Sequence, residues 1–307
     1  MAKTPDPAQV ATRIAVIVCS AGRPECLRPF AERIALQTRQ PDRLLFVVPR
    51  AEDAPPDIAH WAGPGVAAEV VISPKGLPRQ RNHGLNAIAG DCGLVVFFDD
   101  DFLPSRHALA RIAQAFAELP QVNGMTGHLI ADGIRGPGIG VPEAVAMLAR
   151  HDATPQDGPV QVRREGLAGL YGCNMAYRMA AIGAQRFDEA LPLYGWQEDI
   201  DFAARIPGGR IKTDAFAGVH LGIKSGRETA GARLGYSQIV NPWYLVRKGT
   251  MRPRFALNLA LRNMAANHWR GLRPEPWIDR LARARGNWIG LADILRGRAD
   301  PGRILTL

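Results

Sequence analysis

Lysine, paired cysteines and long hydrophobic runs are all scarce in this sequence. Only five of the 38 basic residues in the 307-residue chain are lysines. The four cysteines form no Cys-x-x-Cys pair and no zinc-binding spacing, which argues for reduced thiols rather than a disulfide framework. The longest apolar run, 93–98, is too short to cross a bilayer, and the first ten residues contain no signal-peptide core. We therefore expect a cytoplasmic protein, with any membrane contact peripheral at the cytoplasmic face of the inner membrane.

Positive charge is unevenly distributed along the chain. The formal net charge is +9 and the pI is near 9.9. Residues 251–307 contain eleven arginines and four acids, so they carry +7 of this total. A basic chain suggests a polyanionic partner, such as nucleic acid, an anionic membrane surface or a phosphorylated substrate. Nucleic acid is not expected, because the first 250 residues are close to neutral and the tail does not interleave its arginines with aromatic residues.

The first 120 residues alternate between apolar strands and amphipathic helices. The strands are continuous runs of β-branched and aromatic residues, which is typical of strands buried on both faces of a parallel sheet. The alternation predicts strands over 14–19, 44–48, 69–72 and 94–98, and helices over 25–37, 77–89 and 105–118. We therefore predict an α/β fold, with a Rossmann-like open, mostly parallel sheet flanked by helices.

A helical C-terminal extension is predicted for the last 57 residues, with helices over about 254–269 and 277–295. The second helix has an apolar stripe formed by Trp277, Leu281, Ala284, Trp288, Leu291 and Leu295. Arg280, Arg283 and Arg285 lie off this stripe. Such a helix either packs its stripe against the rest of the chain or lies on an anionic membrane surface. The sequence leaves both interpretations open.

Three consecutive acids, Asp99, Asp100 and Asp101, follow the most apolar strand. Adjacent carboxylates repel one another, and a divalent cation would remove this repulsion, because oxygen ligands suit Mg²⁺ and Mn²⁺. The strand's carboxyl end is also where open α/β sheets bind ligands. The alternative is an acidic turn before a helix capped by Ser105.

A second acidic segment opens the helix predicted at 198–206. Glu198, Asp199 and Asp201 follow Trp196 within five residues. Favourable interaction of acids with the helix dipole explains one or two of them. A carboxylate beside an aromatic ring is also a candidate general base.

Several segments, in this order, resemble the family-2 glycosyltransferases. They are SAGR at 20–23, GLPRQRNHG at 76–84, FFDDD at 97–101, GCNMAYR at 172–178, and FDE at 187–189 with EDID at 198–201. The resemblance covers about residues 13–225. It implies the GT-A fold and metal-dependent, inverting transfer of a sugar from a nucleotide-diphospho-sugar. It also implies a catalytic domain over 1–250, with a nucleotide-sugar half over about 13–120 and an acceptor half over about 121–250, before the tail at 251–307.

Residue roles follow from the same resemblance. The acidic triplet matches the family's DXD motif, so Asp101, with His220, would hold Mg²⁺ or Mn²⁺. Asp199, beside Glu198, would be the base that deprotonates the acceptor. The candidates for donor binding are Ser20, Arg23, Arg81, Asn82, Asp99, Asp100, Lys224 and Arg227. The candidates for the acceptor or sugar pocket are Asn174 and Trp196.

The expected partners are a nucleotide-diphospho-sugar donor and a glycan or lipid-linked glycan acceptor, in exopolysaccharide or lipopolysaccharide synthesis. The second strand ends at Pro49 instead of the acid that commonly contacts the base, so the nucleobase stays open. One alternative is a sugar-nucleotide-forming nucleotidyltransferase, although the turn at 20–23 has only one glycine. Another is a non-enzymatic nucleic-acid-binding protein, which the pI suggests.

Overall fold

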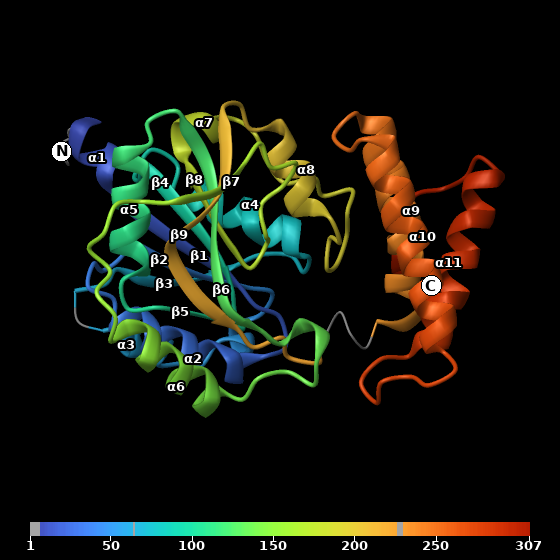
Figure 1. Cartoon of the computed structure of the whole chain (residues 1–307), viewed down its shortest axis with the longest axis horizontal. Helices are drawn as coiled ribbons and strands as arrows, with labels where there is room; N and C mark the ends of the chain where they lie inside the picture. The colour runs from blue at the N-terminus through green and yellow to red at the C-terminus, as the bar shows by residue number, and fades with distance from the viewer. Residues whose placement is uncertain (1–6, 64, 226–229) are drawn as a thin grey trace. The chain divides into compact units, whose positions relative to one another are not determined.

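The computed structural model describes residues 7–63, 65–225 and 230–307, which divide into two compact units (Figure 1). The first unit comprises residues up to 75, 79–186 and 206–223, and the second comprises 76–78, 187–205 and 224–307. Helix α9 (Gly231–Lys248) packs with α10 (Pro253–Arg270) and α11 (Arg280–Leu295) in the second unit. The domain boundary predicted at residue 250 therefore does not coincide with this division.

The first unit is built on one nine-stranded sheet. Its order is β3-β2-β1-β4-β8-β6-β9-β5, and β7 also pairs with β9. Neighbours β3, β2, β1 and β4 are parallel, β8 is antiparallel to both β4 and β6, and β6 is parallel to β9. The strands are β1 (Ile14–Cys19), β2 (Arg43–Val48), β3 (Ala68–Ile72), β4 (Leu94–Asp99), β5 (Phe102–Pro104), β6 (Val122–Asp132), β7 (Val162–Glu165), β8 (Asn174–Arg178) and β9 (Gly209–His220). The predicted fold class is confirmed.

Helices cover both faces of this sheet. Alternate side chains of a strand point to opposite faces, so Val16 of β1 joins a core with Leu27 and Phe30 of α2, whereas Ile17 contacts Gly84 of α4. The helices associated with this unit are α1 (Pro7–Thr12), α2 (Pro24–Ala35), α3 (Ile58–Trp61), α4 (Leu77–Ala87), α5 (Ala108–Glu118), α6 (Val141–Asp152) and α7 (Met179–Ile182), with short 3₁₀ turns η1 (Ala51–Asp53) and η2 (Gly133–Arg135). All four cysteines are free thiols.

Most predicted elements occur with boundaries shifted by a few residues, but one predicted cap is wrong. Helix α5 begins at Ala108, and His107, not Ser105, is at its N-cap position. Ser105 is instead buried, and its carbonyl accepts a 2.6 Å hydrogen bond from Gln37. The sequence interpretation missed the helices α6 and α9 and most of strand β9.

The second unit contains α8 (Glu198–Arg205), the long helices α9 to α11 and the C-terminal turn η3 (Pro301–Leu305). Helices α9 and α11 cross with their backbones in contact. A Cβ atom on Gly235 would overlap the carbonyl oxygen of Arg283, and one on Gly286 would overlap that of Ala232. Only glycine permits this approach, so the two helices cannot rotate about their own axes at the crossing.

Polar side chains fill the space beside this crossing. Asn287 is fully buried and donates to the carbonyl of Gly235 over 2.6 Å. Asn267 of α10 donates to Asn287 Oδ1 over 2.9 Å and to Gln238 Oε1 over 2.8 Å. These amides satisfy one another, which makes their burial tolerable. The inner face of α11 is therefore largely polar, and Ala284 is the one residue of the predicted apolar stripe that is buried.

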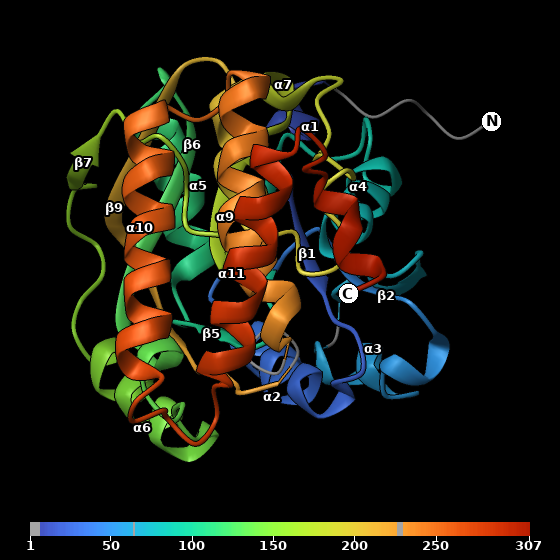
Figure 2. The same ribbon diagram turned by 90° about the vertical axis from the view of Figure 1, so that its right-hand side faces the viewer.

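No described helix is both long enough and apolar enough to cross a membrane. The longest, α9 and α10, have 18 residues each. Figure 2 shows α10 and α11 running in opposite directions.

Candidate active site

The carboxyl ends of β1 and β4 bring the first loop and the acidic triplet together. These strands are parallel neighbours, with Cys19 opposite Asp99. Ser20 follows one strand where Asp100 follows the other, and the Ser20 hydroxyl donates to Asp100 Oδ2 over 2.6 Å. Open α/β sheets bind ligands at this edge, so the candidate site is built from here.

Asp100 is the most buried of the three acids, with 1% of its surface exposed. One carboxylate oxygen accepts from Ser20, and the other forms an ion pair with Arg23. Burial raises the pKa of Asp100, and the guanidinium of Arg23 acts in the opposite direction. Since both oxygens have partners, Asp100 fixes the loop that carries Ser20 and Arg23.

Helix α4 supports the same edge through two consecutive buried residues. Gln80 donates to the carbonyls of Ser20 and Val47, both over 2.8 Å. Arg81 Nη2 lies 3.1 Å from Asp99 Oδ1 and donates to the carbonyl of Gly172 over 2.9 Å. Burial raises the pKa of Asp99, against the opposing charge of Arg81. Arg81, a predicted donor-binding residue, is thus an ion-pair partner of the triplet; Asn82, also predicted, is buried next to it.

His220, the last residue of β9, lies between two carboxylates. Its Nε2 is 3.4 Å from Asp101 Oδ1, and its Nδ1 is 2.8 Å from Asp132 Oδ1. Tyr171 donates to the other oxygen of Asp132 over 3.1 Å. Burial alone would lower the pKa of His220, but the hydrogen bonds to Asp101 and Asp132 raise it to about 10. Burial opposes ionisation of Asp101, yet His220, together with Arg23 and the backbone N–H of Ile223, lowers the pKa of this acid to about 2.

Asp99, Asp101 and His220 form a group that suits a divalent cation. One potential ligand atom from each lies within 4.8 Å of the others. The bond from Nδ1 to Asp132 orients the imidazole and turns Nε2 toward Asp101, as outer partners of metal-binding histidines do. Two carboxylates and an imidazole are acceptable ligands for Mn²⁺ or Mg²⁺, and an ion bound there would displace the Nε2 proton of His220. The residues present therefore fit the metal expected from the sequence, with Asp99 added to the predicted pair.

Two residues of this site gave no recognisable sequence signal. Asp132 ends β6, 88 residues before His220, and only the parallel pairing of β6 with β9 places it opposite that histidine. Tyr171 lies in a loop and packs edge-on against the His220 ring at 6.0 Å. An isolated acid at a strand end and an isolated tyrosine are too common to be recognised without the fold.

Asn174, predicted in the acceptor or sugar pocket, is fully buried at the start of β8. Its side-chain oxygen accepts a hydrogen bond from the Thr126 hydroxyl of β6. Its side-chain nitrogen is buried and has no hydrogen-bond partner among the residues that the structure describes. The placement of Asn174 in the acceptor or sugar pocket stays a prediction.

The predicted base lies in the second unit, at the start of α8. The turn before this helix contains three residues with positive φ: Leu193 at 58°, Gly195 at 65° and Gln197 at 75°. Glu198 is buried and Asp199 is half-buried. Asp199 Oδ1 accepts the backbone N–H of Ile200 over 2.8 Å. Unusual backbone angles at non-glycine residues occur preferentially at functional sites.

The third acid of α8 has a structural role. Asp201 is completely buried and lies 2.8 Å from Arg205 Nη2 and 2.9 Å from Lys248 Nζ. The hydroxyl of Thr250 donates to its other oxygen over 2.8 Å. Asp201 therefore joins α8 to the end of α9, which leaves Glu198 and Asp199 as the candidates for chemistry.

The remaining predicted residues are also in the second unit. The carbonyl of Trp196 accepts a 2.8 Å hydrogen bond from Asn241 of α9, and the Trp196 side chain is half-buried. Lys224 is half-buried in the bend after β9. Arg227 lies outside the described residues.

Comparisons with known proteins agree with this architecture. The profile of Glycosyl transferase family 2 matches residues 15–183, more than half of the chain. S. aureus TarS (residues 1–349) is similar with a TM-score of 0.59 and 14% identity, over 95% of this chain and 82% of that one. The mannosyltransferase PcManGT from Pyrobaculum calidifontis, solved with GDP-Man and Mn²⁺, is similar with a TM-score of 0.53 and 18% identity, over 95% and 85%. No curated protein sequence matches the chain. The structural likenesses show the GT-A fold, and the profile match shows that this chain belongs to glycosyl transferase family 2 and is a glycosyltransferase.

Proposed function

We propose that the protein is a metal-dependent, inverting glycosyltransferase that uses a nucleotide-diphospho-sugar donor. The observation that carries this proposal is the group of Asp99, Asp101 and His220 at the ligand-binding edge of the sheet. When bound there, Mn²⁺ or Mg²⁺ would neutralise charge that develops on the leaving nucleoside diphosphate. The complex of PcManGT with GDP-Man and Mn²⁺ supports the same combination of donor and metal.

Polar and basic side chains would bind the donor. Ser20 and Arg23, held by Asp100, would contact the donor from the loop after β1. Arg81 and Asn82 would contact the nucleotide from α4, and Lys224 and Arg227 would contact the diphosphate. Guanidinium and ammonium groups suit this role because they form charge-assisted hydrogen bonds with phosphate oxygens.

Asp199 would act as the general base. It would take the proton from an acceptor hydroxyl while the oxygen attacks the anomeric carbon and the nucleoside diphosphate leaves from the opposite side. Its half-buried position at the start of α8, after a turn with two non-glycine residues at positive φ, supports this assignment. Glu198 would form the catalytic pair with Asp199, and Trp196 would line the acceptor or sugar pocket.

The acceptor would be a glycan or a lipid-linked glycan at the cytoplasmic face of the inner membrane, in exopolysaccharide or lipopolysaccharide assembly. The arginine-rich helical tail supports this part of the proposal, because anionic lipids attract such segments.

A thermal-shift screen of the full chain with UDP, GDP and other nucleoside diphosphates, each with and without Mn²⁺, tests the donor site. A ligand raises Tm by mass action, so a stabilisation that requires Mn²⁺ is expected with at least one nucleotide. Asp101→Ala should abolish the Mn²⁺-dependent part. A stabilisation that is equal with and without Mn²⁺, in both proteins, would contradict the metal role.

The base is tested by Asp199→Asn with the nucleotide identified in that screen. Transfer should fall by about 10²–10⁴-fold, with Mn²⁺-dependent nucleotide binding retained. Loss of that binding would contradict the assignment of Asp199 as base. Released nucleoside diphosphate is the expected product, whereas pyrophosphate would indicate a nucleotidyltransferase.

A further inference from the structure

The outer face of α11 is apolar although its inner face is polar. Leu281, Trp288 and Leu295 follow one another at seven-residue intervals, which places them along one line of the helix. Their exposed fractions are 69%, 55% and 79%. On the opposite side, Arg283, Asn287 and Asp293 are all at least 95% buried. Of the two interpretations that the sequence leaves open, packing of the stripe against the rest of the chain does not hold for these three residues. The helix exposes apolar side chains and buries polar ones, the reverse of an ordinary surface helix.

This orientation is fixed, because the contact between the backbones at Gly235 and Gly286 prevents rotation of α11. Helix α10 extends the exposed apolar surface. Leu257 and Leu261 are 61% and 57% exposed, and Trp269 is 79% exposed. The indole N–H of Trp288 donates to His268 Nε2 over 2.9 Å, which connects the outer faces of α10 and α11.

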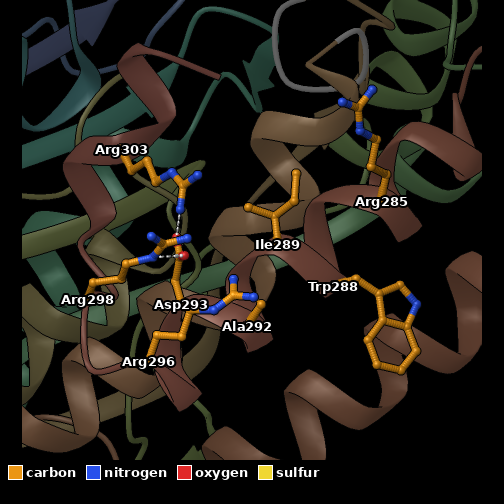
Figure 3. Close-up of a pocket in the computed structure, with 8 residues that line it drawn as sticks. All are labelled: Arg285, Trp288, Ile289, Ala292, Asp293, Arg296, Arg298 and Arg303. Carbon is orange, nitrogen blue, oxygen red and sulfur yellow. Dashed lines mark hydrogen bonds and ion pairs between the residues drawn. The ribbon is translucent and has the colours of Figure 1, made fainter.

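Arginines lie directly beside the stripe. A pocket of about 420 Å³ lies here (Figure 3). Its lining consists of four arginines and four other residues, which lie in α11 at and near Trp288. The arginines are Arg285, Arg296, Arg298 and Arg303, and the other residues are Trp288, Ile289, Ala292 and Asp293. Arg298 Nε donates to Asp293 over 2.8 Å, and Arg303 forms an ion pair with the same acid. With four guanidinium groups and one carboxylate, the lining has a net charge of +3.

Arg285 and Arg296 are the arginines of this pocket that have room for a ligand. Both are exposed, and neither side chain has a hydrogen-bond or ion-pair partner among residues 7–63, 65–225 and 230–307. A planar guanidinium binds phosphate oxygens through two parallel hydrogen bonds. The pocket therefore offers phosphate sites at the edge of an exposed apolar stripe.

We propose that this face docks on an anionic phospholipid bilayer. Leu281 and Leu295 would enter the acyl boundary, Trp288 would lie at the level of the headgroups, and Arg285 and Arg296 would bind lipid phosphates. Apolar side chains flanked by arginines, with tryptophan between them, match the chemistry of that interface. The inference deepens the membrane-side part of the proposed function, on which it rests, and names the residues that make the contact.

Sedimentation of the full chain with vesicles tests the proposal. We expect binding to phosphatidylcholine vesicles that contain about 30% phosphatidylglycerol, and much weaker binding to pure phosphatidylcholine. The double variant Arg285→Ala/Arg296→Ala should lower the partition coefficient about 30-fold, since each arginine near such a surface contributes about 1 kcal/mol. The matched control Arg150→Ala/Arg164→Ala removes the same charge from exposed positions in the first unit and should leave binding within about twofold.

The apolar contribution is tested with Leu281→Ser/Leu295→Ser, which should weaken binding about tenfold or more. Leu36→Ser, at a residue 57% exposed in the first unit, is its control. Each variant is checked for Tm and for Mn²⁺-dependent nucleotide binding. Retention of both, with loss of vesicle binding, separates docking from the proposed sugar transfer.

Several results would overturn the inference. The first is equal binding to neutral and anionic vesicles, or no binding to either. The second is an equal loss in the Arg150/Arg164 control. The third is stabilisation by inorganic phosphate that depends on Arg285 and Arg296 without any vesicle binding, because the pocket would then take a free anion. The fourth is a dimer in light scattering that Leu281→Ser disperses, because the stripe would then join two copies of the chain.

Discussion

The acid site of the first unit and the helix packing of the second both bury polar side chains, but to different effect. At the sheet edge, Asp99 and Asp101 approach within 4.8 Å of each other and of a histidine. Each carboxylate disfavours ionisation of the other, and at Asp101 the neighbouring His220 offsets this repulsion. Beside α11, Asn287, Asn267 and Gln238 complete one another's hydrogen bonds. Carboxylates held together despite their mutual repulsion therefore indicate a ligand site, whereas amides that complete one another's hydrogen bonds fix the position of a helix.

The largest expected effect is the loss of activity in Asp101→Asn. We expect kcat/KM to fall about 10³-fold, equivalent to about 4 kcal/mol of transition-state stabilisation. The free energy of unfolding without metal should fall by only about 1–2 kcal/mol, because the amide still accepts hydrogen bonds. Urea unfolding and initial rates with Mn²⁺ measure the two quantities. If the free energy of unfolding fell by as much as the transition-state stabilisation, Asp101 would have a structural role like that of the buried amides beside α11.

Asp201→Asn should show the opposite pattern. The substitution leaves Lys248 and Arg205 without their buried carboxylate, so the free energy of unfolding should fall by about 3 kcal/mol. Below the lowered Tm, the folded enzyme should keep transfer activity within about tenfold of wild type. Abolished transfer in a protein of wild-type stability would instead place Asp201 in the chemistry.

Asn287→Ala addresses the polar interior of the second unit. Its loss leaves the carbonyl of Gly235 without its side-chain donor and should lower the free energy of unfolding by about 1–3 kcal/mol. The matched substitution Leu281→Ser, on the outer face of the same helix, should change it by less than about 0.5 kcal/mol. Equal losses in the two variants would mean that the outer face of α11 also packs.

The smallest effect concerns Glu275 and pH. Hydrogen bonds from Arg280 lower the pKa of Glu275 to about 2 from a usual value of 4.5. A depressed pKa stabilises the fold above the unfolded value, and this contribution is lost as the pH falls from 4.5 toward 2. Glu275→Gln should therefore lower the free energy of unfolding by up to about 1 kcal/mol at neutral pH, given the partial exposure of the pair. Its difference from wild type should shrink in urea unfolding below about pH 4.

The parallel half of the sheet was predictable because its signals are local. Continuous apolar runs define β1, β2 and β4, and the acids that follow β4 are adjacent in sequence. Strand β9 was missed because three charged residues in its first half, Arg210, Lys212 and Asp214, interrupt any continuous apolar run, and α9 because it contains Gly235 and an internal proline. These elements are determined by packing partners far away in the chain and not by their own propensity.

The same distinction applies to the site. Asp101 and His220 could be identified from motifs, but Asp132 depends on the pairing of β6 with β9. The inverted face of α11 was unpredictable for a similar reason. The apolar stripe is visible in the sequence. The amide of Asn287 on the other side of the helix has its partners on α9 and α10, at Gly235, Gln238 and Asn267, and the periodicity of α11 does not indicate those contacts.

The glycine crossing of α9 and α11 determines how this pair of helices moves. Because backbone touches backbone there, no side-chain rotamer change can alter the separation of the two helices. Their amide protons near Gly235 and Gly286 should exchange with solvent only when both helices open together. The outer face of α11 is therefore rigidly attached to α9, and a displacement of α11 would move α9 with it.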